Sequence, residues 1–167
     1  MSNQSTKYDS SSQIWLLGEA GLFKDEQVAV RLGESVYVGR SRVCTLSVVR
    51  TKISRKMGRG ALEDHPSYRK ISRKHFRVTL LSEELVEVDD LSTNGTAING
   101  HRVDRMQLSI NRDEDRLGTI EFGAGEIVAI CGRPVNDVPS GLTKIGDNEG
   151  ATNVPSEDGA VSGELKR

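Results

Sequence analysis

The sequence predicts an all-β sandwich, and three features support this prediction. Many apolar runs are each the length of one strand, several of them alternate strictly between apolar and polar residues, and turn-forming residues separate them at close spacing. No stretch shows a sustained helical period of 3.6 residues. Short alternating strands joined by frequent turns are typical of two mostly antiparallel sheets packed face to face.

The strand-sized runs follow one another at residues 14–17, 28–32, 36–38, 45–49, 76–81, 85–88 and 126–130. Phe76, Val78 and Leu80 alternate with residues that point to the opposite face, which is the pattern of a half-buried strand. Asn-Gly pairs at 94–95 and 99–100 are strong signals for turns between strands. Strands at this density leave little of the central region for helices.

The 167 residues suffice for one domain of ordinary size. Polar segments without periodicity at 1–12 and 135–167 are predicted to be disordered tails around a domain at 13–134. Within that domain, residues 50–70 lose the alternation and gain lysine and arginine, so the sequence predicts a long basic loop there. A loop of this length is expected to be functional or partly disordered.

The overall composition excludes several classes of protein. The net charge of -1 and the hydrophobic content of 35% are typical of a globular protein and indicate no nucleic-acid or membrane partner. No apolar run approaches the roughly 20 residues that span a bilayer, and the polar start lacks a signal-peptide segment, so a cytoplasmic protein is expected, or a nuclear one in a eukaryote. Cys44 and Cys131 are expected to be buried small side chains.

Three short motifs lie at strand ends of the predicted sandwich: Val-Gly-Arg-Ser at 38–41, Ser-Arg-Lys-His at 72–75 and Ser-Thr-Asn-Gly-Thr at 92–96. Each alone has an ordinary structural explanation, such as a type I′ turn for Asn-Gly. Together and in this order, they closely resemble the forkhead-associated (FHA) family over about residues 14–133. The resemblance implies a sandwich of about eleven strands that binds phosphothreonine peptides with loops at one end. The connection between the first two motifs is longer than is typical of the family.

The residue types suit phosphate recognition. Phosphothreonine carries about -1.5 to -2 charges and three strong acceptor oxygens, so its receptor needs a planar cation and several donors. Arg40 can grip two phosphate oxygens at once, Ser72 can donate its hydroxyl, and Arg73 adds charge from the same loop. These three are the predicted phosphate-binding residues.

Other motif residues are predicted to hold the peptide or the site. The amide of Asn94 can both donate to and accept from an extended main chain, and the resemblance implies a peptide contact for Thr93 as well. The resemblance gives His75 a bracing position inside the site. Gly39 and Gly95 are predicted to support the backbone, the first by allowing a close approach and the second by a positive φ.

A second copy of Ile-Ser-Arg-Lys occurs at 53–56, ahead of the copy at 71–74. Only the later copy is followed by a histidine and by an alternating strand. The phosphate-binding serine is therefore placed at Ser72, with Ser54 as the alternative register.

Two other functions are alternatives to phosphothreonine binding. The basic stretch 40–77 is a candidate nucleic-acid surface, but its only aromatic residues are Tyr68 and Phe76, and Phe76 is expected in the core. A sandwich with a non-phosphate scaffolding role is the other alternative. No enzyme motif or metal-ligand spacing occurs, so no catalysis, cofactor or metal is expected.

The predicted partner is a protein whose threonine has been phosphorylated by a Ser/Thr kinase, either the kinase itself or one of its substrates. A further hypothesis is self-association, in which a phosphorylated tail threonine such as Thr6 or Thr143 enters the site of its own or another copy.

Overall fold

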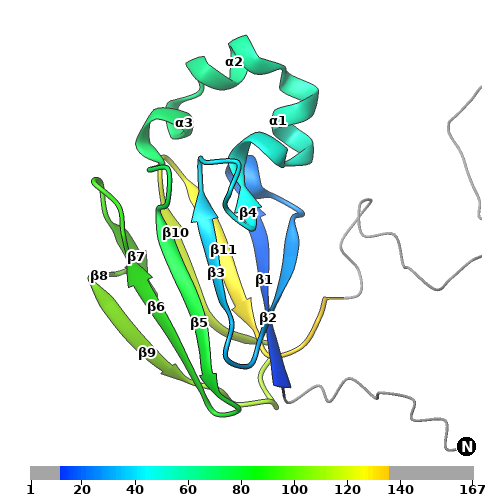
Figure 1. Cartoon of the computed structure of the whole chain (residues 1–167), viewed down its shortest axis with the longest axis vertical. Helices are drawn as coiled ribbons and strands as arrows, with labels where there is room; N and C mark the ends of the chain where they lie inside the picture. Colours follow the sequence, from blue (N-terminus) through cyan, green and yellow to red (C-terminus); the bar gives the residue numbers. More distant parts are fainter. Residues whose placement is uncertain (1–11, 136–167) are drawn as a thin grey trace, which may run out of the picture. The chain divides into compact units, whose positions relative to one another are not determined.

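The computed structural model describes residues 12–135, which form eleven strands in two sheets (Figure 1). The six-stranded sheet has the order β2 (Gln27–Arg31), β1 (Gln13–Ala20), β11 (Glu126–Cys131), β10 (Arg116–Phe122), β7 (Thr96–Ile98) and β8 (His101–Val103). The five-stranded sheet has the order β4 (Leu46–Ser47), β3 (Ser35–Gly39), β5 (Phe76–Ser82), β6 (Leu85–Asp90) and β9 (Arg105–Ser109). Among the pairings with a defined register, only β3 with β4 is parallel. The predicted eleven-stranded, mostly antiparallel sandwich is confirmed.

The core contains the alternating side chains that were predicted to point inward. Phe76, Val78 and Leu80 of β5 are completely buried, and the register places Val88 and Val86 of β6 opposite the last two. They share one apolar cluster with residues of the other sheet, including Ile14, Leu16, Ile120 and Val128. Each such side chain contributes about 1.5–3 kcal/mol by its burial, so the sandwich holds firmly the strand ends from which the loops emerge.

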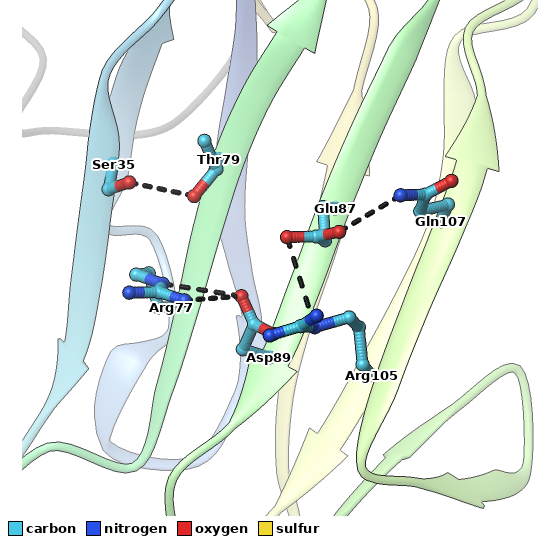
Figure 2. A network of polar contacts seen from close by, with 7 residues as sticks. All are labelled: Ser35, Arg77, Thr79, Glu87, Asp89, Arg105 and Gln107. Atoms are coloured by element: carbon cyan, nitrogen blue, oxygen red, sulfur yellow. Dashed lines mark hydrogen bonds and ion pairs between the residues drawn. The ribbon is translucent and has the colours of Figure 1, made fainter.

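The outer face of the five-stranded sheet carries a polar network across neighbouring strands (Figure 2). Asp89 of β6 accepts hydrogen bonds from Arg77 Nη2 of β5 at 2.8 Å and from Arg105 Nε of β9 at 2.5 Å, and the register places both arginines directly opposite Asp89. In the next row, Gln107 Nε2 donates to Glu87 Oε2 at 2.9 Å. The alternation that buries apolar side chains thus brings these charges together on the outer face.

The basic segment 50–70 was predicted to be a loop, and this prediction was wrong. This segment forms three short helices, α1 (Lys52–Met57), α2 (Arg59–Asp64) and α3 (Pro66–Lys70). The hydroxyl of Thr51 caps α1 by accepting the backbone N–H of Ser54 at 3.1 Å, and Gly58, at φ 84°, separates α1 from α2. Helices of five or six residues are too short to show an apolar period, so only their caps could have indicated them.

Hydrogen bonds and buried side chains hold this helical segment to one end of the sandwich (Figure 1). The backbone N–H of Lys52 donates to Glu26 Oε2 at 2.9 Å, and the backbone N–H of Ala124 donates to Ser67 Oγ at 3.0 Å. Leu62 of α2 and Ile71 after α3 belong to the apolar core. The helices therefore form a wall fixed beside the ends of the strands.

Other predictions about the chain have mixed outcomes. The run at 45–49 was predicted as a strand, but only Leu46–Ser47 is extended, and Val48–Arg50 forms a 3₁₀ turn. Cys44 and Cys131 are buried and free, as expected. Nearly all of the predicted tails, residues 1–11 and 136–167, and with them Thr6 and Thr143, lie outside the described residues. No helix within the described part is long and apolar enough to cross a membrane.

Candidate functional site

The three motifs meet at the end of the sandwich that carries the helices (Figure 1). Arg40 directly follows β3, and its backbone N–H donates to the carbonyl of Ser72 at 3.0 Å. The Ser72 hydroxyl in turn accepts the backbone N–H of Thr93 at 3.1 Å, and Asn94 Nδ2 donates to the carbonyl of Lys70 at 3.0 Å. Loops from both sheets are thus joined into one continuous rim.

Gly39 allows two of these loops to lie close together. A Cβ atom at this position would lie 2.4 Å from the carbonyl oxygen of Arg73 and 2.9 Å from the backbone nitrogen of His75. Neither backbone atom can move without shifting the loop that carries Ser72. The close approach predicted for Gly39 is therefore present, and it places Arg40 next to Ser72.

His75 braces the rim from below. Its side chain is fully buried, Nδ1 accepts the backbone N–H of Ser72 at 3.0 Å, and Nε2 lies 2.9 Å from the carbonyl oxygen of Gly95. This pattern fixes the neutral tautomer with the proton on Nε2. Burial lowers the pKa of His75, although the Gly95 carbonyl and the charge of Asp90 oppose this shift. The imidazole thus joins the Ser72 loop to the Asn94 loop.

The loop between β6 and β7 is held by a polar group that the sequence reasoning missed. The Asp90 carboxylate accepts the hydroxyls of Ser92 at 2.6 Å and Thr96 at 2.8 Å, and Arg102 Nη2 donates to the carbonyl of Asn94 at 2.9 Å. Gly95 has the positive φ expected of it, 97°. The ordinary type I′ hairpin does not apply at 94–95, because β6 and β7 lie in different sheets. Asp90, the last residue of β6, was the available signal.

The predicted contact residues are open to a ligand. Arg73, Thr93 and Asn94 are exposed, and Arg40 and Ser72 are half-buried. Because the Ser72 oxygen accepts a backbone N–H, its own O–H can donate outward. The bond from Asn94 to Lys70 uses one of the two N–H donors of the amide, so the side chain can also bind an extended backbone. By contrast, Ser54 is buried in α1 and bonded to Thr51, which favours the register at Ser72.

A cavity of about 530 Å³ lies beside this rim, between the β3–β4 loop and the helices. Val49, Leu62 and Tyr68 provide its apolar part, and the guanidinium of Arg40 lies over the Tyr68 ring, 5.2 Å from its centroid. Five arginines line it: Arg40, Arg42, Arg55, Arg59 and Arg73. The basic density at 50–70 is visible in the sequence, but the sequence does not show that Arg55 and Arg59 line the same cavity as Arg40.

Among the described residues, one of the five arginines forms an ion pair with a carboxylate. Arg59 pairs with Glu63, four residues later on α2, at 3.3 Å. Within residues 12–135, no ion pair joins a carboxylate to Arg40, Arg42, Arg55 or Arg73. The described residues also contain no cluster of side chains that could hold a metal ion. The site is therefore a rim of hydrogen-bond donors beside an uncompensated positive cavity.

Comparisons with known proteins agree with this architecture. Three solved structures, each 19% identical to this chain, share the fold: the FHA domain of an Arabidopsis thaliana hypothetical protein (TM-score 0.52, covering 75% of this chain and 90% of that one), the FHA domain of CT664 from Chlamydia trachomatis (0.51, 72% and 97%) and the MEK1 FHA domain (0.50, 74% and 92%). A search of curated proteins by sequence found no match.

The family model for the FHA domain matches residues 36–118. The matched segment contains all three motifs, and the structure adds β1, β2 and β11, which complete the six-stranded sheet outside it. The chain therefore carries an FHA domain.

Proposed function

We propose that this chain is a phosphothreonine-dependent binding module whose site is the rim formed by residues 40, 72–73 and 93–94. The supporting observation is that direct hydrogen bonds join these three loops beside arginines that have no carboxylate partner among the described residues. A dianionic phosphate ester supplies the missing negative charge, and the rim supplies donors for its oxygens.

Each contact residue has a separate task. Arg40, oriented by the Tyr68 ring, binds the phosphate with its planar guanidinium, and the Ser72 hydroxyl donates to another oxygen. Arg73 adds charge from the same loop. Asn94 binds the main chain of an extended peptide with its remaining amide groups, and Thr93 contacts the peptide beside it. His75, Gly39 and Gly95 support these residues without touching the ligand.

The module acts by binding, without catalysis, cofactor or metal. Its partner is a cytoplasmic or nuclear protein that a Ser/Thr kinase has phosphorylated on threonine, including the kinase itself. A phosphorylated Thr6 or Thr143 is an alternative ligand from the same or another copy of this chain.

The structure offers little support for the nucleic-acid alternative. Phe76 is completely buried, and Tyr68 is half-buried with the guanidinium of Arg40 over its ring. The basic stretch 40–77 thus lacks an aromatic surface on which bases could stack.

Calorimetry with matched peptides tests the proposal. A library with one fixed phosphothreonine and random neighbours first yields an enriched peptide, which is then titrated in phosphorylated and unphosphorylated form. Only the phosphorylated peptide should bind, and Arg40→Ala should weaken its binding by about 1.5–3 kcal/mol, because a charge-assisted hydrogen bond is lost. Equal affinity for the two forms would refute the proposal.

A further inference from the structure

We propose that the cavity between the β3–β4 loop and the helices is a second anion-binding site, which takes a carboxylate or a second phosphate of the same phosphothreonine ligand. Arg42 and Arg55 are its main contacts. The inference rests on the function proposed above for the neighbouring rim, since that rim holds the rest of the ligand.

The charges of the cavity exceed what one phosphothreonine can neutralise. The ester carries about -1.5 to -2 charges, which Arg40 and Arg73 together balance. Arg42 and Arg55 line the same cavity and form no ion pair with a carboxylate of the described residues. Two exposed guanidinium groups therefore remain for a second anion after the first has been bound.

The second pair of arginines comes from two different segments of the chain. Arg42 belongs to the β3–β4 loop, and Arg55 belongs to α1 of the helical segment. Val49 and Leu62 add apolar side chains to the lining of the same cavity, and its volume is in the range of small-ligand sites. A short acidic side chain can thus pack its carbon atoms against these apolar side chains and bind the arginines through its oxygens.

The walls are held in place without any ligand. Thr51 caps α1 and Lys52 bonds to Glu26, while Arg50 Nη2 donates to the carbonyl oxygens of Cys44 and Thr45. The Cys44 thiol donates to the carbonyl of Arg73 at 3.1 Å. Because the helical wall and the β3–β4 loop are both bonded to the domain, little further ordering is needed on binding.

The ion pair between Arg59 and Glu63 offers a test of whether unpaired arginines in the cavity attract the second anion. Arg59 also lines the cavity, but it forms an ion pair with Glu63, whose Oε1 lies 3.3 Å from Arg59 Nε. Removing that carboxylate should release another cation toward the cavity. Glu63→Gln is therefore expected to strengthen binding of a second anion, whereas a change that merely damaged the helical segment would weaken it.

The test uses the full chain and one enriched phosphothreonine sequence. Three peptides carry alanine, glutamate or phosphoserine at the flanking position where the phosphothreonine peptide library selects acidic residues. Wild type should bind the glutamate and phosphoserine peptides about tenfold or more tightly than the alanine peptide. The double variant R42Q/R55Q should lose this preference and keep its affinity for the alanine peptide, and Glu63→Gln should increase the preference severalfold.

The comparison of glutamate with phosphoserine shows which anion the cavity prefers. The inference is overturned if wild type selects no acidic flank, if R42Q/R55Q keeps the full preference, or if a single-stranded oligonucleotide displaces the second anion and binds more tightly than the peptide. In each of these cases binding would still require phosphothreonine. Loss of that requirement in wild type would instead contradict the proposed function of the rim.

Discussion

On the outer face of the five-stranded sheet, arginines lie beside carboxylates, whereas at the loop end of the same domain they gather around one cavity. Arg77 and Arg105 share the carboxylate of Asp89 (Figure 2). Burial opposes ionisation of Asp89, but hydrogen bonds from the two guanidinium groups outweigh it, so the pKa of Asp89 lies below its ordinary value. At the loop end, Arg40 and Arg73 have no such partner within residues 12–135.

This difference indicates what each set of charges does. Paired charges on the sheet stabilise the folded chain, and little of their field remains for a partner. Uncompensated arginines around one cavity repel one another and cost stability, but they attract an anion. The sheet network therefore supports the fold, and the loop end supports binding.

The largest effect on stability is expected from removing the carboxylate that Arg77 and Arg105 share. Asp89→Asn would leave Arg77 and Arg105 without their main partner, and we expect it to reduce the free energy of unfolding by about 2–3 kcal/mol, because Asp89 is nearly fully buried. Urea denaturation measures this loss. Binding of the phosphothreonine peptide should not change at a temperature where the variant is folded, and a large loss of affinity would show that the two regions are coupled.

The buried imidazole beneath the loop end should make stability depend on pH. Because burial lowers the pKa of His75 below 6.5, the unfolded chain takes up a proton on this residue more readily than the folded chain. The free energy of unfolding should therefore fall as pH drops below about 6.5 and continue to fall until the folded-state pKa is reached. Denaturation at several pH values measures it in wild type and in His75→Gln, which has no titrating ring. Parallel pH profiles for the two would contradict the assignment.

The smallest effect is expected from an arginine of the sheet. Arg105 is about two-thirds exposed, and Arg77 still binds Asp89 when Arg105 is removed. Arg105→Ala should thus reduce stability only slightly, because water screens an exposed ion pair, and should leave peptide affinity unchanged, which makes it the matched control for Arg40→Ala. Equal losses of binding in the two variants would mean that net charge, rather than the position of Arg40, determines affinity.

Much of the fold could be predicted because strand alternation is a local property. Phe76, Val78 and Leu80 show their period directly in the sequence, and the core follows from it. The motif residues could be assigned to loops for the same reason. The helices could not, since none has more than six residues, and their burial depends on contacts such as that of Ser67 with the β10–β11 turn.

The site could be predicted only in part. Arg40, Ser72 and Asn94 lie in recognisable motifs, but the bonds that join them depend on the packing of two sheets. The cavity could not be predicted from the sequence, because Arg42 and Arg55 belong to segments that meet only through the fold of the helices. Likewise, the pairing of Asp89 with Arg105 depends on strand register, which composition does not contain.

Backbone amide chemical shifts recorded during titration with a phosphothreonine peptide would test the contrast between the two regions most directly. We predict that the largest changes occur at Arg40, Ser72 and the segment 93–95, and that Arg77, Asp89 and Arg105 change little. Changes centred on the outer face of the five-stranded sheet, with the loop end unaffected, would contradict the account.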